Sequence, residues 1–155
     1  MKIKIMFALA VAALLSGCQT PQQFATPDTS WNERIGQLKY SDPKRTIIGD
    51  VVVRQRGAQD FQLDFQKAGG IPLLALREDA AIARAEGLFA RGSWQGPAEK
   101  APKHLRNWVA LRAALLHPAS GATWKGEAQS TGGQLNSLAL TFAADGQSFV
   151  FQFNR

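Results

Sequence analysis

The stretch Leu138-Ala-Leu-Thr-Phe-Ala-Ala-Asp-Gly-Gln-Ser-Phe-Val-Phe-Gln-Phe153 decides the fold of this chain of 155 residues. Large apolar side chains stand at every second position on both sides of Asp145-Gly146, which is typical of strands, because successive strand residues point to opposite faces. An Asp-Gly pair favours the tight turn of a β-hairpin. The sequence therefore predicts two antiparallel strands that share one apolar face, made of Leu138, Leu140, Phe142, Phe149, Phe151 and Phe153.

Alternation of the same kind marks more strands earlier in the chain. Apolar and polar residues alternate over residues 47–53 and again over residues 61–65, and residues 56–59 between them can turn. The Gly-Gly-Ile-Pro sequence of residues 69–72 interrupts this pattern. The apolar run over residues 73–76 then has the length of a buried strand. We therefore expect a hairpin followed by a further strand.

Two other segments have the spacing of helices. Over residues 31–40, Trp31, Ile35 and Leu38 recur at intervals of four and three, which predicts a short helix. Over residues 102–117 the apolar residues form a broad stripe at 3.6 residues per turn, and a proline stands at each end of the segment. This second segment is the firmer helix prediction.

Residues 79–91 admit two interpretations. Their alanine-rich composition favours a helix, whereas Gly87 in the middle favours a hairpin. We favour two strands that turn at Gly87. The small side chains of Ala81, Ala83 and Ala85 would then form a face against which a helix can lie closely.

Three charged residues need an interpretation beside these elements. Arg112 lies on the apolar face of the helix predicted over residues 102–117. Its stem could pack on the sheet while the guanidinium reaches the rim, or it could be an interior arginine that bonds a lid or a ligand carboxylate. The adjacent Glu78 and Asp79 would point to opposite faces of a strand, so we interpret them as a solvated turn and not as an acid–base pair.

The N-terminal segment carries the most specific motif. Lys2 and Lys4 precede an apolar run over residues 5–15, and Ser16-Gly17 forms a small-residue cleavage site before Cys18, so the segment is typical of a secretory signal. It resembles the bacterial lipoprotein signal, which implies removal of residues 1–17 and attachment of lipid to Cys18. We then expect a flexible polar tether over residues 18–30 and a single domain over residues 31–155.

The composition and the remaining motifs exclude several classes of function. Cys18 is the only cysteine, so the domain must be stabilised by an apolar core and not by disulfides. The formal net charge is +6, but the basic residues are interspersed with acidic ones and form no basic strip. Neither this charge pattern nor secretion suits a nucleic-acid partner. His104 and His117 have no metal-ligand spacing, and no serine lies in a Gly-x-Ser-x-Gly motif. We therefore expect no metal, no cofactor and no enzymatic activity.

Three segments together resemble the lipoprotein-localisation family of the carrier LolA and the outer-membrane receptor LolB. These segments are Phe-Gln-Leu-Asp-Phe at residues 61–65, Gly-Gly-Ile-Pro-Leu-Leu-Ala-Leu at residues 69–76, and His-Leu-Arg-Asn-Trp-Val at residues 104–109. The resemblance implies an α+β fold, in which a curved antiparallel sheet forms an incomplete β-barrel covered by one or two helices. It also implies an apolar concavity for the acyl chains of other lipoproteins and an apolar side chain on a loop between strands, for which Ile71 is the candidate.

The function expected from sequence is therefore binding of acyl chains or of a lipidated partner in an apolar concave sheet. The alternative is a structural or interaction lipoprotein of the cell envelope, in which the same face is a filled core. Gln19 after the cysteine resembles the pattern of lipoproteins sent to the outer membrane, so we expect a lipid-anchored outer-membrane protein that faces the periplasm. The inner membrane is the alternative location. The candidate cleft residues are Phe61, Leu63, Phe65, Leu138, Leu140, Phe142, Phe149, Phe151 and Phe153.

Overall fold

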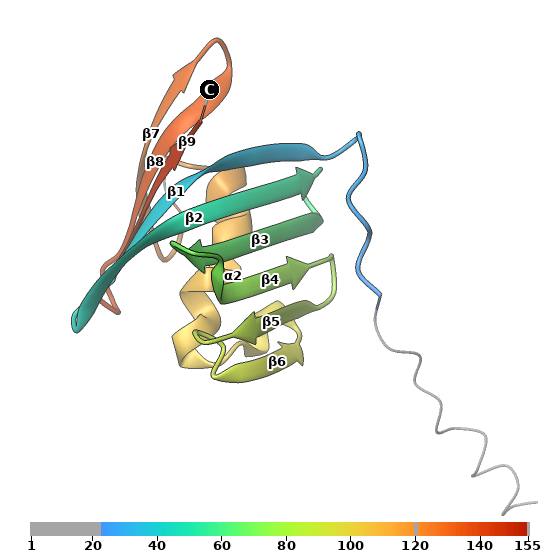
Figure 1. Cartoon of the computed structure of the whole chain (residues 1–155), viewed down its shortest axis with the longest axis vertical. Coiled ribbons are helices and arrows are strands. Elements are labelled where there is room, and N and C mark those ends of the chain that lie inside the picture. Colours follow the sequence, from blue (N-terminus) through green and yellow to red (C-terminus); the bar gives the residue numbers. More distant parts are fainter. Residues whose placement is uncertain (1–22, 120, 155) are drawn as a thin grey trace, which may run out of the picture.

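The computed structural model describes residues 23–119 and 121–154. Nine antiparallel strands form one sheet in the order β6-β5-β4-β3-β2-β1-β9-β8-β7 (Figure 1). The strands are β1 (Asn32–Asp42), β2 (Arg45–Arg56), β3 (Asp60–Lys67), β4 (Ile71–Glu78), β5 (Ala83–Gly87), β6 (Gly92–Gly96), β7 (Lys125–Thr131), β8 (Gln134–Phe142) and β9 (Gln147–Phe153).

The α+β prediction was wrong, because the described chain is dominated by this single sheet. Its helices are the 14-residue α2 (Lys103–Leu116) and the single turn η1 (Ala98–Lys100). The curved antiparallel sheet was expected, but among the described residues only one helix longer than a single turn accompanies it. The sheet is not closed, since its edge strands β6 and β7 do not pair with each other.

The error lies at residues 31–40, where the predicted helix is strand β1. Along β1, Leu38 and Tyr40 are buried while Ile35 is half exposed on the other face, so the segment alternates with the period of a strand. β1 pairs with β2 over its whole length and with β9 over Gly36 to Ser41. It therefore joins the two predicted groups of strands into one sheet, and these long-range pairings override the local spacing.

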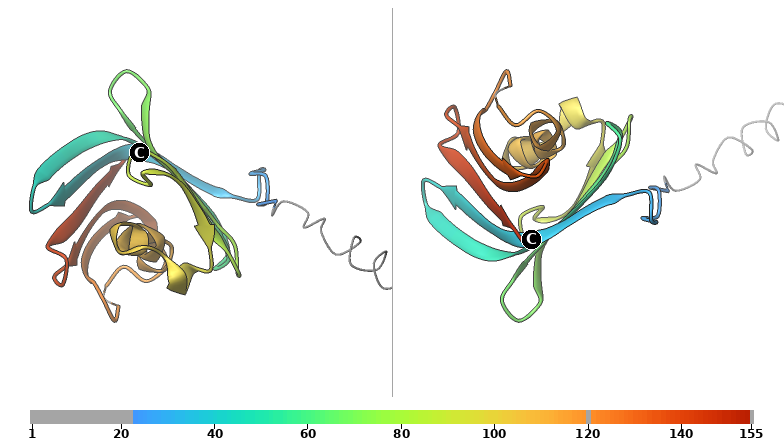
Figure 2. Two further views of the ribbon diagram at one scale, coloured as in Figure 1. Left: turned by 90° about the horizontal axis from the view of Figure 1, so that it is seen from below. Right: turned by 90° about the horizontal axis from the view of Figure 1, so that it is seen from above.

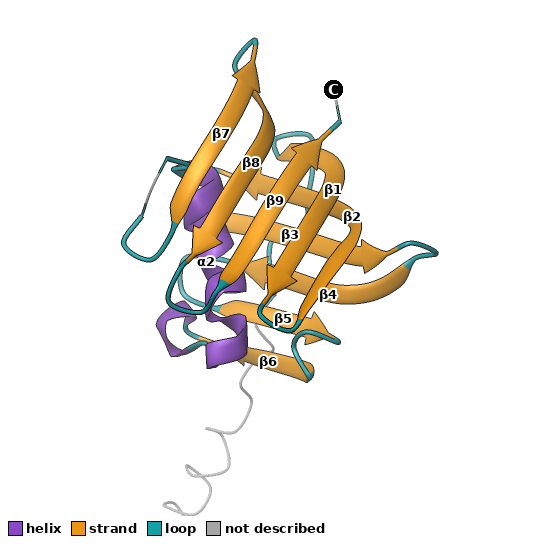
Figure 3. Cartoon of the chain, turned by 90° about the vertical axis from the view of Figure 1, so that its left-hand side faces the viewer, coloured by secondary structure: helices purple, strands orange, loops and turns teal. Residues whose placement is uncertain are grey.

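Helix α2 confirms the prediction made for residues 102–117. Pro102 stands at its N-terminal boundary, where a missing N–H costs nothing, and its carbonyl accepts hydrogen bonds from Leu105 and Arg106. The helix lies inside the curve of the sheet, where it contacts β4 on one wing and β8 on the other (Figure 2). Figure 3 shows it behind β7, β8 and β9.

The predicted hairpin is present in place of a helix, but its turn spans residues 88–91, so the second strand begins at Gly92 and not directly after Gly87. Strands β5 and β6 pair from Ala83–Gly96 to Gly87–Gly92. Ala83 and Ala85 are fully buried, whereas Ala81 is exposed and does not belong to the small face that we predicted. The predicted strands on both sides of Asp145-Gly146 are β8 and β9, and those over residues 47–53, 61–65 and 73–76 are β2, β3 and β4.

The predicted signal peptide, Cys18 and the first part of the tether lie outside the described residues. Within the rest of the tether, the carbonyl of Ala25 accepts a hydrogen bond of 3.0 Å from the Gln62 side chain. Gln62 alternates with the inward-facing Phe61 and Leu63, so this segment contacts the outer face of β3. None of the helices in the described part of the chain is long and apolar enough to cross a membrane.

Candidate functional site

The nine predicted cleft residues come together on the concave face of the sheet. Three come from β3, three from β8 and three from β9, and none has more than 8% of its surface exposed. Sequence periodicity thus placed all nine on the correct face. They belong to one continuous core, which also includes the apolar side of α2.

Trp108 on α2 fills the centre of this face. Its ring centroid lies 4.8 Å from that of Phe149, 5.1 Å from Tyr40, 5.3 Å from Phe89 and 5.8 Å from Phe65. Aromatic contacts at these distances are favourable in tilted and edge-on arrangements. The concave face is therefore occupied by the chain's own helix.

Side-chain hydrogen bonds tie the first half of α2 to the hairpin between β8 and β9. The amide of Asn107 donates to the Asp145 carboxylate over 3.0 Å and to the Gln147 side-chain oxygen over 2.9 Å. Asn107 is itself buried, so these bonds compensate the removal of its amide from water. They also fix the position of Trp108, the next residue along the helix.

The second half of α2 is tied to the sheet by Arg112. Its Nη1 donates to the carbonyl oxygens of Asp79 over 2.5 Å and Gln59 over 3.2 Å, and its Nε lies 3.5 Å from the Glu78 carboxylate. The structure favours the first of the two interpretations of Arg112, because the side chain is 23% exposed and the guanidinium reaches turn carbonyls at the rim of the sheet. The carboxylate beside it is that of Glu78, a residue of the same chain.

The prediction that Glu78 lies in a solvated turn was wrong. Its side chain is 1% exposed, because it points to the concave face from the end of β4, in alternation with Leu74 and Leu76. Burial raises the pKa of its carboxyl to about 8, although the positive charge of Arg112 acts in the opposite direction. Within the described chain, neither carboxyl oxygen has a hydrogen-bond partner.

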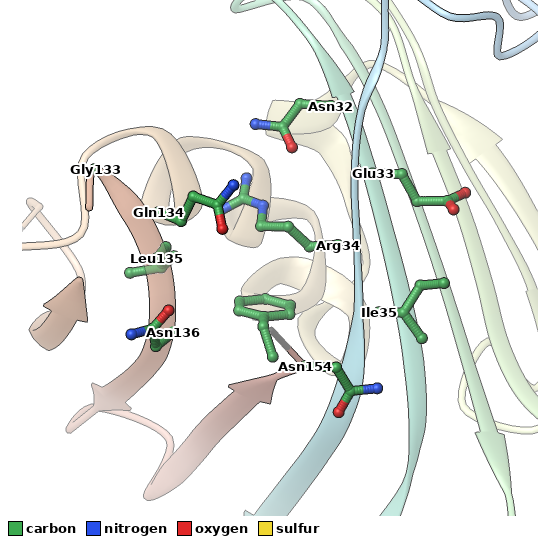
Figure 4. A pocket seen from close by; sticks show the side chains of 10 residues that line it. Asn32, Glu33, Arg34, Ile35, Gly133, Gln134, Leu135, Asn136 and Asn154 are labelled. Atoms are coloured by element: carbon green, nitrogen blue, oxygen red, sulfur yellow. The ribbon is translucent and has the colours of Figure 1, made fainter. Parts of the chain in front are cut away.

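A pocket of about 540 Å³ opens where β9 ends between β1 and β8 (Figure 4). Arg34 reaches from β1 across this pocket toward Gln134, and its guanidinium carbon lies 5.4 Å from the ring centre of Phe153. Leu135 adds an apolar side chain to the wall. No local sequence pattern predicted this pocket, because its walls on β1, β8 and β9 are brought together by pairings between residues far apart in the chain.

A second pocket of about 730 Å³ lies at the N-terminal end of α2. Tyr40, Phe89 and Trp108 line it together with His104, Asp42 and Asp145, but no serine is among its lining residues. The Nε2 of His104 is buried without a hydrogen-bond partner among the described residues. The pocket therefore brings a histidine near acids, without the nucleophile that a serine hydrolase requires.

Ile71, the predicted partner residue, is 58% exposed at the start of β4. Gly69 and Gly70 before it have φ values of +89° and +77°, which a residue with a side chain rarely adopts. Figure 2 shows the turn between β3 and β4 projecting from the sheet. The turn thus holds an apolar side chain out in solvent.

No protein-family model and no curated protein matches the sequence. In residues 23–119 and 121–154, no group of three histidine, cysteine, aspartate or glutamate side chains could hold a metal ion.

Proposed function

We propose that this chain is a lipid-anchored, non-enzymatic protein of the cell envelope that binds an acyl chain, or the lipid of a modified partner, on its concave face. Helix α2 is the internal plug that the incoming chain displaces. The observation that carries this proposal is an open sheet whose concave centre is wholly apolar and is covered by one helix.

The apolar burial energies of two states, one with α2 on the concave face and one with an acyl chain there, are of the same order. Burying about 14 methylenes of an acyl chain gains roughly 11 kcal/mol. Lifting α2 exposes four large side chains that are now at most 4% exposed, and this costs roughly 6–12 kcal/mol. These side chains are Leu105, Trp108, Leu111 and Leu115. The apolar part of this exchange is therefore close to balance, and lifting α2 would in addition break the hydrogen bonds of Asn107 and Arg112.

The rest of the proposal concerns the position of the domain. Lipid on Cys18 would anchor the domain in a membrane. Gln19 matches the pattern of lipoproteins sent to the outer membrane, so we propose that membrane. The tether would let the domain approach incoming lipoproteins in the periplasm. The exposed Ile71 is the proposed contact for a membrane or a partner. The resemblance to LolA and LolB supports this assignment.

A second candidate is a structural or interaction lipoprotein with a permanent core. The observation in its favour is the dense packing of Trp108 against four aromatic rings. In that case α2 would not leave the sheet.

Quenching by a brominated fatty acid tests the two candidates. A variant that keeps Trp108 and replaces Trp31, Trp94 and Trp124 with phenylalanine reports contact at the centre of the concave face. Bromine quenches tryptophan only at close range, so we expect bromostearate to quench Trp108 in a saturable manner at micromolar concentration.

The matched control keeps Trp31 as the only tryptophan, because Trp31 lies outside the core cluster and contacts Arg56. It should show little quenching. Equal quenching of both variants would indicate adsorption to the surface. A folded Trp108 variant that is not quenched would refute acyl binding and favour the permanent core.

A further inference from the structure

We propose that the pocket between β1, β8 and the end of β9 is a phosphate-binding site in which Arg34 is the principal ligand. Its position, between the start of β1 and the start of β8, is shown in Figure 4. The site lies apart from the filled centre of the concave face. It does not depend on the proposed binding of acyl chains.

The side chain of Arg34 is held in place by neutral groups alone. Its Nη2 donates to the side-chain oxygen of Gln55 over 2.5 Å, and its guanidinium stacks near the ring of Phe153. Its Nε is buried and has no hydrogen-bond partner within the described residues. The guanidinium of Arg34 is thus held in one orientation, but not all of its N–H donors have an acceptor.

No described carboxylate forms an ion pair with Arg34. Glu33, the acid in the pocket wall, bonds the Nε of Arg54 over 2.6 Å, and Figure 4 shows its side chain pointing away from Arg34. Burial lowers the pKa of Arg34, which reflects a charge that has lost water and gained no counter-charge. A partly buried cation without a counter-charge is stabilised by an anion that enters the pocket.

The other lining groups favour phosphate among anions. Asn32 and Gln134 carry carboxamides beside the Arg34 guanidinium (Figure 4), so a phosphate can use these donors with the oxygens that the guanidinium leaves free. Arginine forks match phosphate oxygens with two parallel hydrogen bonds. Phe153 and Leu135 beside the fork provide an apolar wall for the first carbons of a lipid.

Side-chain NMR of the full chain in neutral dodecyl maltoside micelles tests this site. The Nε–Hε resonance of Arg34 is followed during titration with dihexanoyl phosphatidate, with inorganic phosphate, and with dihexanoylglycerol, which lacks the phosphate. We expect a saturable shift with phosphatidate and none with dihexanoylglycerol. A similar shift with inorganic phosphate would identify a free phosphate as the ligand, whereas a shift with phosphatidate alone would identify a lipid headgroup.

Two variants should remove binding and one should preserve it. Arg34→Gln removes the charge, and Gln55→Glu gives Arg34 an internal carboxylate, so each should weaken phosphatidate binding at least tenfold. Since the resonance of Arg34 is lost in the first variant, binding is measured there by isothermal titration calorimetry. Arg54→Gln changes the neighbouring arginine on the outer face and should leave the affinity unchanged.

Three results would overturn the proposal. The first is no shift of Arg34 with either phosphate compound in the folded wild-type chain. The second is phosphatidate affinity in folded Arg34→Gln within twofold of the wild type, which would place the lipid elsewhere. The third is a shift with hexanoate and not with phosphate, which would show that the pocket selects carboxylates.

Discussion

Two arginines enter the interior from opposite sides of Gln55, and their surroundings differ. Arg34 comes from β1 and donates to the Gln55 oxygen, while the Gln55 amide donates over 3.5 Å to the carbonyl of Arg112 on α2. Arg112 has the Glu78 carboxylate and two carbonyls as partners. Arg34 has one neutral amide and an aromatic ring.

The positive charge of Arg112 therefore has a structural role, whereas the positive charge of Arg34 has no counter-charge in the described chain. Around Arg112, every partner belongs to the fold, and the contacts fix α2 against β4. Around Arg34, the fold supplies orientation but no counter-charge, and a pocket lies beside the guanidinium. Removing each arginine should therefore change the stability in opposite directions.

The largest expected effect is the pH dependence that comes from Glu78. Its pKa is about 8 in the folded chain and about 4.5 in the unfolded chain, so the folded state binds the proton more tightly. The stabilisation is complete below pH 4.5, and it is lost as the pH rises through 8. At about 1.4 kcal/mol per pKa unit, we expect a loss of up to about 5 kcal/mol across this window in urea unfolding experiments.

Glu78→Gln is the control for this pH dependence, because it cannot titrate. Its unfolding free energy should vary much less between pH 5 and 8.5 than that of the wild type. An equally steep loss of stability in Glu78→Gln would show that another group is responsible.

Arg112→Met should have the next largest effect. It leaves Glu78 without its cation and frees the carbonyls of Gln59 and Asp79, so we expect a loss of about 2–4 kcal/mol in the unfolding free energy at pH 8.5. The loss should be smaller at pH 6, where Glu78 is protonated. Arg106→Met on the exposed side of α2 is the matched control, and it should cost less than about 0.5 kcal/mol.

Arg34→Met should do the reverse in the absence of an anion. A methionine of similar length removes a partly buried charge that has no counter-charge, and it can pack on Phe153, so we expect a gain of about 1 kcal/mol in the unfolding free energy. Thermal unfolding in a buffer free of phosphate measures it. A loss of more than about 1 kcal/mol would mean that the bond to Gln55 is structurally essential, and the contrast with Arg112 would then disappear.

The sequence predicted the apolar part of the interior but not these charged residues. The nine cleft residues follow an unbroken period of two, and the hairpin that turns at Asp145-Gly146 is local. β1 breaks this rule, because its inward positions are Arg34, Gly36, Leu38 and Tyr40, of which only the last two are large and apolar. A side chain at Gly36 would collide with the backbone of Gln152 on β9, which no local pattern reveals.

The burial of Glu78 could have been predicted from the same alternation of strand residues. It continues the alternation of Leu74 and Leu76 at the inner face of β4, so extending the predicted strand by two residues would have placed it in the core. Its partner Arg112 is brought to it only by the docking of α2. Local rules are broken where a residue serves the site or a distant contact, and these residues were the ones misjudged.

Among Arg34, Arg54 and Arg112, the smallest expected effect belongs to Arg54, the neighbour of Arg34 on the outer face. Arg54 forms ion pairs with Glu33 over 2.6 Å and with Asp64 over 3.1 Å, and about a quarter of its side chain is exposed. Water can replace these partners, so Arg54→Gln should change the unfolding free energy by no more than about 1 kcal/mol, and less at high salt. Urea unfolding at 0.05 and 0.5 M NaCl measures this. If Arg54→Gln proved as costly as Arg112→Met, then burial of the partner carboxylate, 1% exposed for Glu78 against 26% or more for the partners of Arg54, would not explain the difference between these two arginines.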